Sequence, residues 1–267
     1  MKHYLAFHTV FILNENIKWL EEFIIYYKHI GFDHFYLYDN EGSNGGDGSQ
    51  THNKYNFPIT TTSTLQNQLD LQNILAKYND CITYIKWQPK YNNTIIYGQT
   101  DSINDCLNKY GDENEWIAFF DLDEFIYSST YDNFNLANYL KTLDITISCV
   151  KLTQKKFLDR FLSTEKFITQ DFKCISEHTI DTSKWAPKNI VRCKDVVHVS
   201  YIHEILVKKE TYTPDINILR FNHYNFNKKQ SEWMKGYYKK EYDTNFEFVL
   251  DSEDCGMKQY EHLFIQK

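Results

Sequence analysis

The sequence contains few of the residues that mark fibrous, secreted or membrane-spanning chains. Its 267 residues include only 9 glycines and 4 prolines, which excludes collagen-like and low-complexity structure. The 6 cysteines are scattered and form no Cys-x-x-Cys pair, so we expect reduced thiols rather than a disulfide framework or a zinc site. The most apolar stretch near the start, residues 4–13, is short and contains His8, whereas a bilayer span needs about 20 apolar residues. We therefore expect a cytoplasmic protein without a signal peptide or a transmembrane segment.

An excess of positive charge is also missing. The formal net charge is −7, and because non-specific nucleic-acid binding depends on neutralising phosphates with Lys and Arg, we expect no nucleic-acid partner. Hydrophobic residues make up 42% of the chain, and a chain of this length can bury about three quarters of its extended surface. The composition predicts a globular protein with a large core and predicts nothing about its oligomeric state.

Two periodicities alternate along the first 125 residues. Short apolar runs predict four strands, at residues 5–13, 34–38, 82–87 and 116–122. Between them, apolar residues recur at helical spacing; Asn14 or Asn16 would cap the first helix, and Gly31 would close it. The residues whose spacing suggests the second helix are Leu65, Leu69, Gln72 and Leu75. This alternation favours an α/β fold with a mainly parallel sheet that is covered by helices on both faces.

The second half of the chain is less regular. Apolar runs predict strands at residues 147–152, 190–192, 196–199, 205–207 and 219–224. Residues 231–242 read as an exposed helix with Ser231 as its cap. Since no linker rich in Pro, Gly or Ser separates the halves, we expect a single domain over residues 1–267 with an irregular C-terminal half.

An acidic segment follows the fourth predicted strand directly. Residues two apart in a strand point to the same face, so Asp121 and Asp123 would project together where the sheet stops. Two close carboxylates repel each other, and a bound Mg²⁺ or Mn²⁺ relieves that repulsion. The alternative is a solvated turn. Because ligands of such sheets bind outside the carboxyl ends of the strands, the polar residues Asn14, Glu15, Asp39 and Asn40 at other strand ends point to the same region.

The sequence resembles glycosyltransferases of family 92, a group with the GT-A fold, and more loosely the wider family-2-like GT-A enzymes. The matching pieces occur in the family's order between about residues 5 and 240. They are Asn14-Glu15, residues 19–23, 26–28 and 31–40, Gln99, residues 104–106, 121–125 and 188–192, and residues 222–224.

The resemblance implies a GT-A-like fold and a metal-dependent enzyme that moves a sugar from a nucleotide-sugar donor to a glycan acceptor with inversion, with UDP-galactose as the default donor. Residues 1–125 would bind the donor, and residues 126–267 would form the acceptor side and the C-terminal helices. Asp121 and Asp123 match the DxD motif, which holds Mn²⁺ or Mg²⁺ against the donor diphosphate, and His223 matches the histidine that completes the metal site. The residues implied for the nucleotide sugar are Phe11, Asn14, Glu15, Asp39, Asn40, Gln99, Asp105, Asp121, Leu122 and Lys188.

An inverting transfer also needs a general base for the acceptor hydroxyl. The sequence leaves this residue open. Asp159 is the first choice, with Glu204 and Glu177 as alternatives, although Asp159 can equally be a surface charge that pairs with Arg160 or Lys156. The chain lacks the Gly-containing segment that the family often shows here.

Two functions of other classes fit some of the same residues. Strand-end acids and histidines can build the two-metal site of a phosphoesterase or another hydrolase, which predicts about two ions per chain. The abundant aromatic side chains can bind carbohydrate without catalysis. His198, His203 and Glu204 occur close together, but they lack the order of a helical zinc-protease motif.

Overall fold

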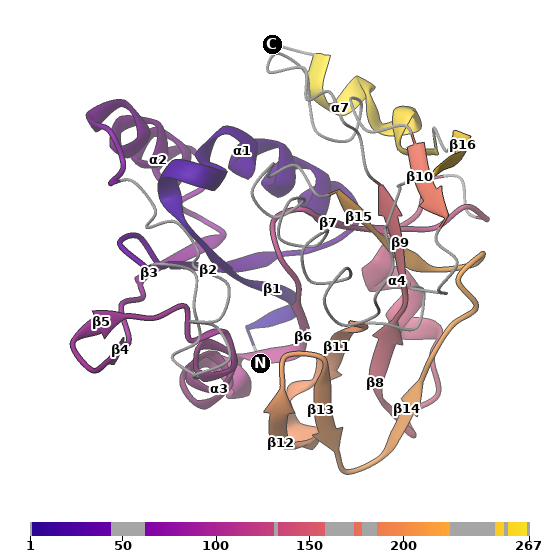
Figure 1. The fold of residues 1–267 in the computed structure, drawn as a ribbon. Helices are drawn as coiled ribbons and strands as arrows, with labels where there is room; N and C mark the ends of the chain where they lie inside the picture. The colour runs from indigo at the N-terminus through magenta and orange to yellow at the C-terminus, as the bar shows by residue number, and fades with distance from the viewer. Residues whose placement is uncertain are drawn as a thin grey trace. The chain divides into compact units, whose positions relative to one another are not determined.

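The computed structural model describes residues 2–43, 62–130, 133–157, 174–177, 186–224, 249–253 and 256–265 (Figure 1). The chain divides into two compact units. Unit 1 comprises residues 1–122, 135–151 and 188–213, and unit 2 comprises residues 123–134, 152–187 and 214–267. The boundary falls inside the acidic segment, between Leu122 and Asp123. The single domain expected from the sequence stays a prediction.

Unit 1 is built on a seven-stranded sheet with the strand order β14-β8-β11-β6-β1-β2-β3. β1 pairs in parallel with both β2 and β6, β2 pairs in parallel with β3, and β14 pairs in parallel with β8, whereas β11 is antiparallel to β6. The bounds are β1 His3–Phe11, β2 His34–Asp39, β3 Ile82–Lys86, β6 Asn114–Phe119, β8 Ile147–Leu152, β11 Lys188–Arg192 and β14 Glu210–Tyr212. The predicted α/β fold with a mainly parallel sheet is therefore confirmed.

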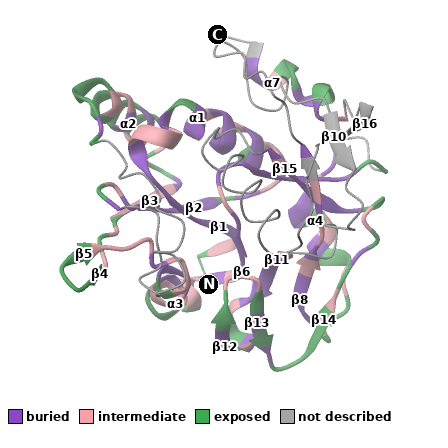
Figure 2. Ribbon diagram, in the orientation of Figure 1, coloured by how far each residue is buried: buried purple, intermediate pink, exposed green. Residues whose placement is uncertain are grey.

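Helix α1 (Leu13–His29) covers one face of this sheet. The ring of Phe7 on β1 lies 4.7 Å from that of Phe23 and 4.4 Å from that of Tyr27, both on α1. Strands β1 and β2 are buried along almost their whole length (Figure 2). Burial on both faces explains why these strands are continuous apolar runs in the sequence.

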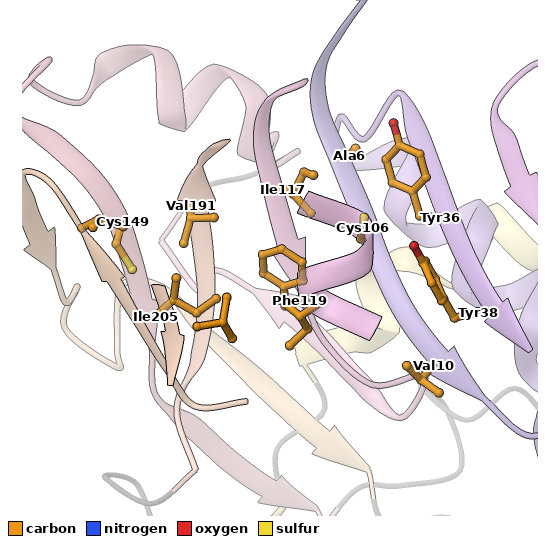
Figure 3. Close-up of a cluster of buried hydrophobic side chains, with 13 residues drawn as sticks. Ala6, Val10, Tyr36, Tyr38, Cys106, Ile117, Phe119, Cys149, Val191 and Ile205 are labelled. Atoms are coloured by element: carbon orange, nitrogen blue, oxygen red, sulfur yellow. The ribbon is translucent and has the colours of Figure 1, made fainter. Parts of the chain in front are cut away.

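Helix α3 (Gln99–Tyr110) covers the opposite face. Its Ile103 and Cys106 pack in one buried cluster with Ala6 and Val10 of β1 (Figure 3). Neighbouring residues of a strand point to opposite faces, so Ala6 and Phe7 place the two helices on different sides of the sheet. The predicted helical cover on both faces is confirmed.

The ends of α1 are fixed by local contacts. The helix begins after Ile12, earlier than the predicted cap, and Asn16 accepts a hydrogen bond from the backbone N–H of Ile12 over 2.9 Å. Gly31 follows the helix with φ of 104°, and a Cβ there would come within 2.8 Å of Asn135 Oδ1. Only glycine has both the backbone freedom and the small size that this turn needs.

Helix α2 (Leu65–Lys77) exists as predicted, but two of the leucines whose spacing indicated it are exposed. Leu65 and Leu69 are 73% and 43% exposed, whereas Leu71 and Ile74 are buried. The helix carries apolar residues at two overlapping helical spacings, so periodicity alone does not select the buried face.

The other elements of unit 1 are short. A two-stranded antiparallel hairpin joins β12 (Val196–Tyr201) to β13 (Glu204–Val207). The rest are β4 Lys90–Tyr91, β5 Thr94–Ile95, α4 Leu136–Thr142 and the 3₁₀ helices Gly111–Glu113 and Cys193–Asp195.

Unit 2 contains a five-stranded sheet with the order β16-β10-β9-β15-β7. β15 pairs antiparallel with β7 and parallel with β9. The bounds are β7 Glu124–Tyr127, β9 Gln154–Phe157, β10 Cys174–Glu177, β15 Arg220–Tyr224, β16 Val249–Glu253, the 3₁₀ helix Gly256–Tyr260 and α7 His262–Ile265. The helix expected at residues 231–242 lies outside the described residues. Within the ranges that the structure describes, no helix has both the length and the apolar character that a bilayer crossing needs.

Candidate active site

The carboxyl ends of β1, β2 and β6 lie along one edge of the unit 1 sheet, because these strands are parallel. Phe11 and Asp39 are register partners at the ends of β1 and β2, and the N–H of Asn40 donates to the carbonyl of Phe11 over 2.7 Å. Asp121 follows two residues after the end of β6. The structure thus brings four of the predicted donor-binding residues to one edge.

The carboxylate of Asp121 is held by two donors from other elements. Gln99 Nε2, at the start of α3, donates to Oδ1 over 2.6 Å, and Lys188 Nζ, at the start of β11, donates to Oδ2 over 2.6 Å. The Lys188 side chain is only 3% exposed, whereas that of Asp121 is 31% exposed. The sequence predicted all three residues for donor binding, and the structure joins them in one hydrogen-bonded group.

Asp39 lies in a second polar group at the same edge. Its buried carboxylate accepts hydrogen bonds from Tyr84 Oη over 2.6 Å, Lys86 Nζ over 2.8 Å and the backbone N–H of Glu41 over 3.0 Å. Burial opposes ionisation of Glu41, but hydrogen bonds from Ser63 and Lys86 lower the pKa of that carboxyl. The three donors hold the carboxylate of Asp39 in a fixed orientation, so it is a preorganised acceptor.

Asn40 is fully buried beside Asp39, and its amide orientation is fixed. Nδ2 donates to the carbonyl of Trp87 over 2.9 Å and to that of Ile96 over 3.0 Å. Among the described residues, Oδ1 has no hydrogen-bond partner. A buried amide oxygen in this position is a candidate acceptor for a donor group of a ligand or for a bound water.

The remaining predicted donor-binding residues of unit 1 are placed as follows. Asn14 and Glu15 lie in the first turn of α1 and are partly buried. Asp105 lies within α3, where its carboxylate accepts from Tyr38 Oη over 2.8 Å and from Lys109 Nζ over 2.7 Å. Asp105 thus ties α3 to β2, which is a structural role that the sequence did not predict.

His8 lies in the hydrophobic core and belongs to neither polar group. It is 2% exposed, and its ring centroid lies 4.8 Å from that of Tyr38 and 5.3 Å from that of Phe119. Burial lowers the pKa of His8 to about 3, so the imidazole is neutral at physiological pH.

In unit 2, strand pairing brings Asp123 and His223 together. β15 runs antiparallel to β7 with His223 opposite Glu124, and the N–H of Tyr224 donates to the carbonyl of Asp123 over 2.7 Å. His223 Nε2 lies 3.3 Å from Asp123 Oδ2, and both side chains are largely buried. Two residues that the resemblance implied for the metal site therefore lie beside each other, while the metal site itself stays a prediction.

The other ring nitrogen of His223 faces two acceptors. Nδ1 lies 3.2 Å from Gln154 Oε1 on β9 and 3.8 Å from Glu124 Oε1. With acceptors on that side, the hydrogen of a neutral ring belongs on Nδ1, so Nε2 turns its lone pair toward the carboxylate of Asp123. A proton or a metal cation between Nε2 and Oδ2 removes the repulsion between these two lone-pair donors.

The 3.3 Å distance between His223 Nε2 and Asp123 Oδ2 fits two ligands of one metal ion. Two ligands at about 2.1 Å on neighbouring vertices of an octahedral ion lie about 3 Å apart. Asp123 and His223 supply oxygen and nitrogen ligands that Mn²⁺ accepts. Asp121 and the buried Leu122 belong to unit 1. In the described part of the chain, no group of three His, Cys, Asp or Glu side chains is arranged to hold a metal.

Sequence reasoning missed Gln154, and it did not assign a role to Glu124. Glu124 directly follows the DxD motif, so its position was a usable signal. Gln154 is 69 residues away from His223 in the chain, and only the pairing of β9 with β15 brings it close.

The three candidate bases are placed differently. Asp159 lies outside the described residues. Glu177 ends β10 in unit 2. Glu204 begins β13 in the hairpin of unit 1 and is exposed, and His198 is an exposed residue of the same hairpin. The general base stays a prediction.

These features define an α/β protein with polar residues at the carboxyl ends of parallel strands, the place where such sheets bind ligands. A family model of glycosyltransferase family 92 matches residues 66–255, which is well over half of the chain. The chain therefore belongs to glycosyltransferase family 92. The matched residues include Asp121, Asp123, Lys188 and His223.

Three solved structures are similar to the chain at low sequence identity. For the crystal structure of S. aureus TarS, identity is 11%, coverage is 92% of this chain and 41% of that chain, and the TM-score is 0.43. For the apo structure of the WbbM bifunctional glycosyltransferase, identity is 8%, coverage is 73% of this chain and 32% of that chain, and the TM-score is 0.35. For an active-site mutant of LgtC, identity is 9%, coverage is 95% of this chain and 68% of that chain, and the TM-score is 0.31. The chain spans less than half the length of the TarS chain. No curated protein matches it.

The family match confirms the resemblance found in the sequence. The mainly parallel sheet agrees with the GT-A-like class that the resemblance implied. A sugar donor and a sugar acceptor are the partners that this class of enzyme requires.

Proposed function

We propose that the chain transfers a hexose from a nucleotide-sugar donor to a glycan acceptor, with Mn²⁺ or Mg²⁺ as cofactor and inversion at the anomeric carbon. A UDP-sugar is the proposed donor, and UDP-galactose is the first to test. The observation that carries the proposal is the pairing of Asp123 with His223 at 3.3 Å in a family 92 chain. It is the arrangement expected of two protein ligands that share one cation.

The proposal assigns the cation to Asp123, His223 and Asp121. Gln154 and Glu124 keep the hydrogen of His223 on Nδ1, so Nε2 remains a ligand atom. Asp121 joins the set because of the DxD motif, since it is two residues from Asp123 in the chain. When bound, the cation supplies Lewis-acid stabilisation of the negative charge that develops on the leaving diphosphate.

The donor's nucleoside is assigned to the polar edge of the unit 1 sheet. Asp39 offers a fixed carboxylate and Asn40 an amide oxygen whose orientation is set by two backbone carbonyls. Phe11, Asn14 and Glu15 follow one another at the end of β1 and the start of α1 and complete the proposed nucleoside site. Lys188, Gln99 and Leu122 are assigned to the diphosphate end.

Inversion requires direct attack of an acceptor hydroxyl on the anomeric carbon while a carboxylate removes the proton. Asp159 is the proposed base, with Glu204 and Glu177 as the alternatives to test beside it. Replacing each by its amide and measuring the transfer rate identifies the base, because loss of a general base lowers the rate by about 10²–10⁴-fold.

Ligand-dependent stabilisation tests the proposal directly. Thermal unfolding of the chain is measured with a panel of nucleoside diphosphates and nucleotide sugars, with and without Mn²⁺. We expect UDP and one UDP-sugar to raise the unfolding temperature only when Mn²⁺ is present, since a ligand that binds only the native state stabilises it. The proposal is wrong if no nucleotide or nucleotide sugar stabilises the chain in the presence of Mn²⁺ and none is hydrolysed or used for transfer.

A further inference from the structure

The contact between Lys188 and Asp121 is unusual for a carboxylate assigned to a metal ion. Both oxygens of Asp121 accept hydrogen bonds, from Gln99 and Lys188, each over 2.6 Å. One of these donors is a full positive charge, so the carboxylate that the DxD motif offers to a cation is already neutralised from within the chain. An ammonium and a divalent cation repel each other strongly when both lie against the same carboxylate.

The burial of Lys188 restricts what can happen next. Its side chain is 3% exposed, and a buried ammonium that loses its anionic partner is strongly destabilising. Lys188 can leave Asp121 only when another anion takes its place. The diphosphate of the donor is such an anion, and the compact, rotatable ammonium of a lysine can change partners more easily than a bidentate arginine.

Gln99 has the complementary property. Its amide is neutral and holds Oδ1 of Asp121 from the first turn of α3. A neutral donor does not repel a cation, so Gln99 can keep the carboxylate in place whether Lys188 or a metal ion is its charged partner.

We propose that Lys188 is an internal cation that holds Asp121 until the donor diphosphate binds, and that it then exchanges Asp121 for the phosphate and leaves the carboxylate to the divalent cation. This inference rests on the proposed function. It makes cation binding at Asp121 depend on the donor, so that the metal alone binds weakly and the diphosphate and the metal bind cooperatively.

The proposal predicts opposite changes in two affinities when Lys188 is replaced. Binding of Mn²⁺ alone and of UDP with Mn²⁺ is measured by calorimetry on the wild-type chain and on Lys188→Met. We expect Mn²⁺ alone to bind the variant about tenfold more tightly, because Asp121 is released, and UDP to bind about tenfold less tightly, because a charged hydrogen bond is lost. A lysine that serves only as a structural support would lower both affinities or neither.

Two further variants separate this effect from a general change in charge and from misfolding. Lys77→Met removes the same charge from another ion pair of unit 1, the exposed 2.5 Å contact with Glu21, and should change both affinities less than about twofold. Lys188→Gln removes the charge but keeps a polar group, and it should show the same two opposite changes if Lys188→Met does not fold. In the double variant Lys188→Met/Asp121→Asn, the gain in Mn²⁺ affinity should disappear.

The outcomes distinguish the inference from the proposed function. If neither Lys188→Met nor Lys188→Gln binds Mn²⁺ alone more tightly than the wild-type chain, or if the gain survives in the double variant, the exchange does not occur and the proposed function still stands. If the wild-type chain binds neither Mn²⁺ nor UDP, the proposed function is wrong and the exchange falls with it.

Discussion

Asp121 and Asp123 are two residues apart in the chain, yet their side chains have different kinds of partner. Asp121, in unit 1, is neutralised by the ammonium of Lys188 and held by Gln99. Asp123, in unit 2, faces the imidazole of His223, whose other nitrogen is directed toward Gln154. The first carboxylate is paired with a lysine ammonium, whereas the second faces an imidazole nitrogen.

The comparison shows that the two acids of one short motif need not have equal roles. A sequence pattern treats them alike, because both are carboxylates at a strand end. Their partners come from residues 22 to 100 positions away in the chain, and these partners decide which acid is ready for a cation. On this basis we expect Asp123 to dominate metal binding and Asp121 to dominate the coupling between metal and donor.

The largest expected effect is that of Asp123→Asn. The amide is a weaker metal ligand than the carboxylate, so we expect transfer from the best UDP-sugar to fall by about 1,000-fold, the size of effect seen when one group that stabilises transition-state charge is removed. The measurement is release of UDP at saturating Mn²⁺. Asp112→Asn, an exposed acid of the 3₁₀ helix in unit 1, is the matched control and should retain full activity. Equal activity of the two variants would contradict a metal role for Asp123.

The next effect concerns the partner that fixes His223. Gln154→Leu removes the acceptor 3.2 Å from Nδ1, so the hydrogen of the ring can move to Nε2 and block the ligand atom. We expect Mn²⁺ affinity in the presence of UDP to fall about 10- to 100-fold, as for other residues that orient metal-bound histidines. Nitrogen NMR of the histidine ring should show the change of tautomer without metal. Gln154→Glu keeps an acceptor and should preserve both readouts; if it fails like Gln154→Leu, packing rather than orientation is responsible.

Much of unit 1 could be predicted from the sequence because its strands are buried on both faces. β1 and β2 are continuous apolar runs, and the polar residues directly after them, such as Asn40, fall at the edge where ligands bind. The buried face of α2 could not be predicted, because Leu65 and Leu71 belong to two overlapping helical patterns and only packing chooses between them.

The sequence predicted which residues belong to the candidate site, but not which of them contact one another. Asp121, Lys188 and Gln99 were all expected near the donor, but nothing local in the sequence shows that one ion pair joins residues 67 positions apart. Gln154 was missed altogether, since an isolated glutamine carries no signal of its own. Contacts that depend on strand pairing between distant segments are decided by the fold rather than by local pattern.

Stability offers a third way to test the difference between the two acids. Asp121→Asn leaves the buried Lys188 without an anionic partner, and because Asp121 is itself a third exposed, we expect the free energy of unfolding to fall by about 2 kcal/mol. Asp123→Asn should lower it by about 1 kcal/mol, because the amide that replaces the carboxylate keeps a polar group beside His223. Urea unfolding of both variants measures the difference. Combining Asp121→Asn with Lys188→Met should restore part of the loss, and strict additivity of the two changes would show that the ion pair contributes nothing to stability.

The two units also differ in the surroundings of their histidines. Burial lowers the pKa of His8 to about 3, so between pH 6.5 and 3 the unfolded chain binds a proton there that the folded chain does not. Above pH 6.5, His8 therefore does not make the free energy of unfolding depend on pH. Below pH 6.5, the free energy of unfolding falls by about 1.4 kcal/mol per pH unit, the value for one proton. Burial also lowers the pKa of His34 to about 4, which adds a second contribution over the range from pH 6.5 to 4.

His8→Phe tests this difference, because it removes the titrating group while keeping a ring among Tyr38 and Phe119. Urea unfolding between pH 7 and 4.5 should give a pH slope that is smaller by about one proton than in the wild-type chain. An unchanged slope in His8→Phe would mean that His8 titrates alike in the folded and unfolded chain. His8 would then behave like a solvated histidine. The difference proposed between the apolar surroundings of His8 and the polar surroundings of His223 would then have no measurable consequence.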